Sequence, residues 1–133
     1  MTSSTRWTLW EIEYRRGGLV ERPVTEELQA RGSATDTKQA IAKLRLLKAQ
    51  GWPVPRGSLD IESVGAGLYV LKCKPGFWRF YFSVIDPQRR ILLLLVVAKK
   101  KWGRNPNDIP KAARRFADYQ HGRAGACEAR FDD

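Results

Sequence analysis

Residues 91–98 read ILLLLVVA, an uninterrupted apolar run between Arg90 and Lys99. A half-exposed strand alternates apolar and polar residues, whereas a strand covered on both faces is apolar throughout. The run is far too short to cross a bilayer as a helix, which needs about 20 residues. We therefore predict a central strand in a sheet whose two faces are both covered.

Two further strand-like segments precede this run. Residues 68–74 and residues 77–85 are separated by Pro75-Gly76, and residues 86–89 (DPQR) form a second turn. Connections this short imply antiparallel neighbours. Residues 68–98 are therefore predicted to form three consecutive antiparallel strands.

Upstream of these strands, residues 10–14 alternate apolar and charged side chains, which predicts a half-buried strand. Helical patterns follow at residues 24–31 and in the segment after Asp36, which is the expected cap of the second helix. Gly51 is its expected end. Residues 51–67 contain several Pro and Gly residues, and we interpret them as a loop.

A last helix is predicted between Asn107, its expected cap, and Gly122. Its apolar stripe consists of Ile109, Ala112, Ala113, Phe116 and Tyr119. The order strand, helix, helix, three strands, helix predicts an α+β domain at residues 1–122, with helices packed on a twisted antiparallel sheet. Residues 123–133 are expected to be a flexible tail.

The chain is strongly basic: 24 Lys and Arg against 14 Asp and Glu give a net charge of +10 over 133 residues. This balance favours an anionic partner such as nucleic acid, an acidic protein or anionic lipid, although charge also serves solubility. The two cysteines fit neither a disulfide scaffold nor a zinc site, so we expect no metal and no cofactor. The N-terminal residues do not resemble a signal peptide, and we expect a cytoplasmic protein without a membrane segment.

Several cations are predicted to converge on one face of the sheet. Arg79 shares its strand face with Tyr81, while the opposite face of that strand is wholly apolar. A hairpin at Pro75-Gly76 would bring Lys72 and Lys74 beside Arg79, with Lys99 and Lys100 at the end of the next strand. Close cations are costly unless an anion arrives, and a phosphate backbone is one such anion. The alternative is that these residues are ordinary charges of an edge strand.

The segments LYVLK, GFWRFYF, DP, ILLLLVVAKK and NPxDIxxAxRR follow one another between Leu9 and Tyr119. In this order and spacing they resemble the RelE/ParE superfamily of bacterial toxins, most closely its phage-derived, HigB-like branch. The resemblance implies a small fold like that of microbial ribonucleases. It also implies a type II toxin that cleaves mRNA on the ribosome without metal, neutralised by a helix-turn-helix antitoxin.

The resemblance assigns roles to particular residues. Arg79 matches the arginine that stabilises the phosphate, Lys72 matches a basic residue of the preceding strand, and Lys99 and Lys100 match a basic pair at a strand end. The catalytic set is therefore predicted to be Arg79, Lys72 and Lys100, with Tyr119 or His121 as acid or base. Further RNA contacts are predicted at Lys74, Lys99, Lys101, Trp102, Arg104 and Arg115.

Two departures keep other functions open. Val70 stands where RelE has a second basic residue, and residues 102–106 hold neither Tyr nor His. Tyr119 also fits a core aromatic and His121 a surface residue. The alternative is a non-catalytic protein of this fold, such as a gyrase inhibitor or a nucleic-acid-binding phage-derived protein.

Overall fold

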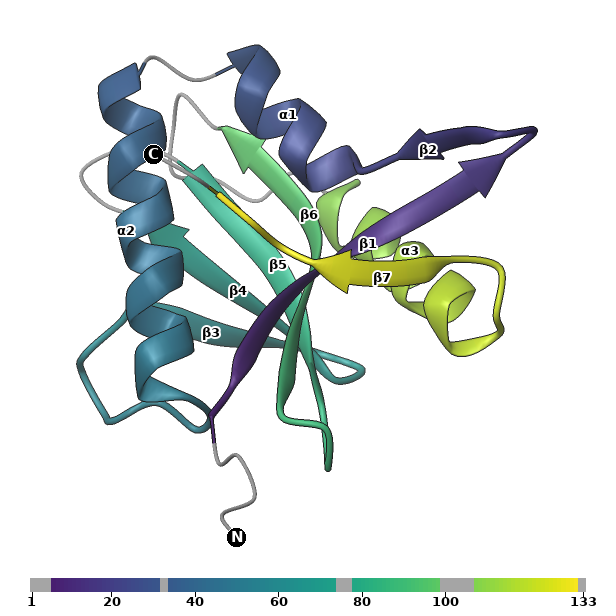
Figure 1. Cartoon of the computed structure of the whole chain (residues 1–133). Coiled ribbons are helices and arrows are strands. Elements are labelled where there is room, and N and C mark those ends of the chain that lie inside the picture. The colour runs from purple at the N-terminus through teal and green to yellow at the C-terminus, as the bar shows by residue number, and fades with distance from the viewer. Residues whose placement is uncertain (1–5, 32–33, 74–77, 99–106, 132–133) are drawn as a thin grey trace, which may run out of the picture.

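The computed structural model describes residues 6–31, 34–73, 78–98 and 107–131, which form a mixed α+β fold around a seven-stranded sheet (Figure 1). In chain order the elements are β1 (Thr8–Arg16), β2 (Leu19–Glu21), α1 (Pro23–Arg31), α2 (Ala34–Gln50), β3 (Ile61–Gly65), β4 (Leu68–Cys73), β5 (Trp78–Ile85), β6 (Arg90–Ala98), α3 (Asp108–Gln120) and β7 (Gly125–Glu128). The α+β class predicted from the sequence is therefore confirmed.

The sheet has the strand order β2-β1-β6-β5-β4-β3, with β7 paired to β1. Strands β4, β5 and β6 are antiparallel neighbours, as predicted. The sheet is not antiparallel throughout, however, because β1 and β6 run parallel, with Leu9 opposite Ile91. Parallel neighbours need a long crossover, and here α1, α2 and the strands β3–β5 lie between β1 and β6 in the chain.

Strand β6 is the buried centre of the sheet, and no residue from Ile91 to Val96 is more than 1% exposed. Helices α1 and α2 cover one face, where Leu28, Leu44 and Leu47 pack against the sheet. Helix α3 covers the other face through Ala112 and its neighbours. Figure 1 shows the two sides, with α2 and α3 on opposite sides of the strands. The prediction of a strand covered on both faces is confirmed.

Two local predictions were wrong. The predicted loop at residues 51–67 contains β3, which pairs with β4 after a turn in which Gly65 and Gly67 have positive φ. Helix α2 begins at Ala34, so Asp36 lies in its first turn rather than at its cap. The prediction that Asn107 is the N-cap residue of α3 is confirmed, although its side chain makes no capping hydrogen bond.

The expected tail at residues 123–133 contains β7 instead. This strand pairs with β1, with Cys127 opposite Glu11, and the chain then returns to helix α2. There the Arg45 guanidinium donates a hydrogen bond to the carbonyl oxygen of Phe131 over 2.9 Å. The C-terminal segment thus covers the outer edge of β1, an edge that would otherwise present unpaired backbone groups.

Candidate functional site

Lys72 and Arg79 lie directly opposite each other in the antiparallel pair of β4 and β5. Side chains at opposite positions share one face of the sheet and have Cβ atoms about 5 Å apart. This is the face covered by α3, since Val70 and Tyr81 of the same two strands belong to the core beneath that helix. The predicted adjacency of Lys72 and Arg79 is therefore confirmed.

Arg79 is buried rather than open to solvent, with 6% of the residue exposed. Its neighbours are the phenol of Tyr81, two residues further along β5, and the carboxyl group of Asp108 in the first turn of α3. Burial and the nearby Asp108 carboxylate raise the pKa of Tyr81, while Arg79 acts in the opposite direction. The phenol is therefore protonated at neutral pH and can donate a proton or a hydrogen bond.

Lys72 already has a partner within the protein. Its ammonium nitrogen lies 3.0 Å from the Oε2 atom of Glu62 on β3, and the two side chains are 24% and 39% exposed. An ion pair with this exposure is worth about 0–1 kcal/mol, so an anionic ligand could displace it. With Glu62 and the buried Asp108 present, this face carries less net positive charge than the sequence predicted.

Three residues of this cluster received no role from the sequence. Tyr81 could have been found from its spacing of two residues from Arg79, which puts both on one strand face. Glu62 was missed because residues 61–65 were interpreted as loop. For Asp108 the sequence holds no signal, because only the packing of α3 brings it to β5.

The predicted residues of α3 lie away from Lys72 and Arg79. Arg115 donates a hydrogen bond to the carbonyl oxygen of Leu94 over 2.9 Å, and its side chain is only 12% exposed. Burial lowers the pKa of this guanidinium, and Glu27 lies 3.8 Å away. Arg115 is therefore engaged in holding α3 against β6.

Tyr119 and His121 lie at the end of α3 opposite to Asp108. Eleven residues separate Asp108 from Tyr119, which corresponds to about 16 Å along a helix. Tyr119 packs against the core beneath α3, and His121 is exposed at the helix end. The structure thus does not bring either residue to the Arg79 cluster. The other predicted site residues, Lys74, Lys99, Lys100, Lys101, Trp102 and Arg104, lie outside the described residues.

Within the described ranges, no three His, Cys, Asp or Glu side chains are arranged to hold a metal ion. Cys73 and Cys127 are both free thiols, and burial raises their pKa values to about 12 and about 11. No described helix has the length and apolar character needed to span a membrane.

No protein-family model matches this sequence, and a search of curated proteins finds no relative. The resemblance to RelE/ParE toxins therefore depends on the order and spacing of residues in this chain. The geometry brings one cluster together on the α3 face of the sheet, formed by Lys72, Arg79, Tyr81, Asp108 and Glu62.

Proposed function

We propose that this chain is a toxin of the RelE/ParE type that cleaves mRNA on the ribosome without a metal, and that a helix-turn-helix antitoxin neutralises it. The observation that carries the proposal is the direct opposition of Lys72 and Arg79 on one sheet face. The order of elements and the net charge of +10 support the same proposal.

The proposed reaction needs a phosphate clamp and a proton donor. The 2′-hydroxyl of the RNA loses its proton to water as its oxygen attacks the adjacent phosphorus, so that the new O2′–P bond forms while the bond from phosphorus to the 5′-oxygen breaks. Lys72 and Arg79 offset the charge that develops on the phosphate oxygens. The protonated phenol of Tyr81, which hydrogen-bonds with Arg79, can donate a proton to the leaving 5′-oxygen.

A second candidate is favoured by the burial of Arg79 and by the ion pair of Lys72. In this alternative the cluster holds the fold together, and the protein acts by binding, as a gyrase inhibitor or a phage-derived nucleic-acid-binding protein. Both candidates use an anionic target, but only the first produces cut mRNA.

The test is expression of the parent chain and of Lys72→Gln in bacterial cells, with growth followed and mRNA 5′ ends mapped. Lys111→Gln is the matched control, because Lys111 is an exposed lysine of α3. The first proposal expects cuts at fixed codon positions from the parent and the control, and about 100-fold fewer from Lys72→Gln. Growth arrest with intact mRNA would favour the second candidate, and the absence of both effects would contradict both.

A further inference from the structure

Exposed arginines gather where the C-terminal part of α3 meets the hairpin of β1 and β2. The hairpin projects from the sheet (Figure 1), and Arg16 lies next to its turn, paired with Leu19. Arg16 is exposed, as are Arg114 on α3 and Arg123 just after that helix. These three side chains come from separate places in the chain, so only the fold brings them together.

A hydrogen bond between Tyr14 and Asp118 fixes the place where the arginines meet. The Tyr14 hydroxyl donates to Oδ2 of Asp118 over 2.7 Å, and Arg123 donates to Oδ1 of the same carboxylate over 3.0 Å. These two bonds lower the pKa of Asp118, so the carboxylate is ionised at neutral pH. Both of its oxygens are therefore engaged within the protein.

The guanidinium groups of Arg16 and Arg114 lie around this bond. The Cζ atom of Arg16 is 5.2 Å from the centre of the Tyr14 ring, which places a cation over an aromatic face. The charge of Arg114 acts on the ionisation of both Tyr14 and Asp118, so its guanidinium lies close to the same bond. Within the described part of the chain, neither Arg16 nor Arg114 forms an ion pair.

The acidic groups of this cluster are fewer than its cations. Glu21 faces Tyr14 across the pair of β1 and β2 and, together with Asp118, gives the cluster two carboxylates. Three arginines stand against them, which leaves one net positive charge. The planar guanidinium groups of Arg16 and Arg114 can each donate two hydrogen bonds to the oxygens of a phosphate group.

We propose that Arg16 and Arg114 bind the phosphate backbone of single-stranded RNA, beyond the part of the strand held by the Arg79 cluster. Asp108, beside Arg79, and Asp118 are ten residues apart on α3, which is about 15 Å along the helix. That length corresponds to four or five nucleotides at about 3.4 Å each. A strand whose phosphate lies at Arg79 can therefore reach the second cluster along α3.

This continuity along one helix favours RNA over an acidic protein segment, which is the other anion that such a cluster could bind. The inference rests on the proposed RNA target, but it does not depend on RNA cleavage. It assigns the hairpin and the C-terminal part of α3 to holding the strand, and it leaves the chemistry to the Arg79 cluster.

The probe is a fluorescein-labelled 2′-O-methyl oligouridylate of about ten nucleotides, long enough to span both clusters. It lacks the attacking 2′-hydroxyl and therefore cannot be cut by the proposed reaction. Its binding is measured by fluorescence anisotropy over a series of salt concentrations. The test variant is Arg16→Gln with Arg114→Gln, and circular dichroism verifies that it keeps the parent's fold.

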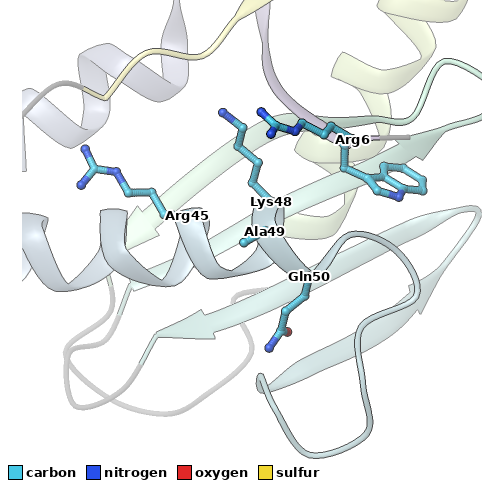
Figure 2. A pocket seen from close by; sticks show the side chains of 6 residues that line it. Arg6, Arg45, Lys48, Ala49 and Gln50 are labelled. Carbon is cyan, nitrogen blue, oxygen red and sulfur yellow. The ribbon is translucent and has the colours of Figure 1, made fainter. Parts of the chain in front are cut away.

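The control variant is Lys48→Gln with Arg130→Gln, which removes the same charge from two exposed residues on the α2 side. Lys48 extends from α2 and lines a pocket of about 710 Å³ (Figure 2). Arg130 lines the adjoining pocket, where Glu128 is an acidic neighbour. Loss of overall charge thus affects both variants alike, and loss of a phosphate contact affects the test variant alone.

We expect the test variant to bind about tenfold more weakly than the control variant. The slope of log affinity against log salt should also fall by about 0.7 for each of the two arginines. Arg16→Lys with Arg114→Lys keeps the charge but loses the planar fork, and it should bind about threefold more weakly than the parent.

Two results would overturn the proposal. Equal binding by the test and control variants would mean that the cluster does not contact the backbone. Equal binding by the lysine variant and the parent would mean that the guanidinium groups do not grip a phosphate. Neither result bears on mRNA cleavage, which is read from transcript ends, so failure here is distinguishable from failure of the proposed function.

Discussion

Helices α3 and α2 cover opposite faces of one sheet, and the cations on the two sides differ in their surroundings. On the α3 side, Arg79 is buried beside Tyr81 and Asp108, and Lys72 is paired with Glu62. On the α2 side, Arg45 and Lys48 are exposed, and Arg45 donates a hydrogen bond to the carbonyl oxygen of Phe131. The α3 side therefore holds Lys72 and Arg79 close to acidic groups within the fold, whereas the α2 side carries Arg45 and Lys48 at its surface.

The way each helix is attached explains the difference. Helix α3 is joined to the sheet by polar bonds, including a 2.7 Å hydrogen bond from the Tyr14 hydroxyl to Asp118 and the bond from Arg115 to Leu94. Helix α2 is attached through apolar side chains such as Leu44 and Leu47. Because α2 packs on the sheet through apolar side chains, its charged residues Arg45 and Lys48 lie at the surface.

The largest expected effect is on the stability of the α3 side. Arg79→Met should lower the free energy of unfolding by about 3 kcal/mol, because it leaves the buried polar atoms around the guanidinium without their neighbour. Lys48→Met, on the exposed side of α2, should change it by less than about 0.5 kcal/mol. Urea denaturation followed by circular dichroism measures both. Equal effects would show that the two sides do not differ as described.

The next largest expected effect concerns the close contact between Gly51 and the Trp7 indole. Gly51→Ala should cost about 2–3 kcal/mol of stability, since it adds a positive-φ penalty and a clash with the indole. Gly57→Ala is the matched control, because Gly57 also has a positive φ but nothing lies within 4 Å of its added Cβ. The control should cost about 1 kcal/mol. Urea denaturation measures both variants, and an equal loss of stability in the two would contradict a clash between residue 51 and the indole.

The sequence predicted the central part of the fold because local patterns determine it. The continuous apolar run at residues 91–98 identified β6, and the alternation at residues 10–14 identified β1. The short turns between β4, β5 and β6 gave their order and the opposition of Lys72 and Arg79. Each of these features depends only on residues close together in the chain.

The errors concern strands whose own residues carry no clear strand pattern, and β7 depends in addition on a distant partner. Strand β7 was read as a tail because its polar, alanine-containing sequence becomes a strand only by pairing with β1. Strand β3 was missed because Pro and Gly residues surround it in the sequence. Strand β2 was missed because it is short and its Leu19 and Val20 side chains are exposed.

A smaller effect tests the polar attachment of α3. Tyr14→Phe removes the hydroxyl that donates to Asp118 and should cost about 1 kcal/mol at neutral pH. The Tyr14 hydrogen bond, followed by the one from Arg123, lowers the pKa of Asp118 below its ordinary value of 3.8. A carboxylate with a lowered pKa contributes stability above its unfolded-state pKa and loses it as the pH falls through the folded-state pKa.

The difference in melting temperature between parent and Tyr14→Phe should therefore be constant from pH 7 to about pH 4 and shrink below the ordinary pKa of Asp118. Asp118→Asn should remove most of this acid dependence. A difference that stays constant down to pH 2 would mean that the phenol packs without bonding to the ionised carboxylate.

The smallest expected effect concerns the ion pair between Lys72 and Glu62 on the α3 side. A double-mutant cycle with Lys72→Gln and Glu62→Gln should give a coupling energy of about 0.5 kcal/mol, as expected for a partly exposed ion pair. If RNA competes with Glu62 for Lys72, Glu62→Gln should tighten binding of a 2′-O-methyl oligouridylate, which cannot be cleaved by the proposed reaction, by a factor of about two, because the ligand no longer has to displace the carboxylate. Fluorescence anisotropy of the labelled oligomer measures the affinity. An unchanged affinity would mean that the α3 side does not contact RNA through Lys72.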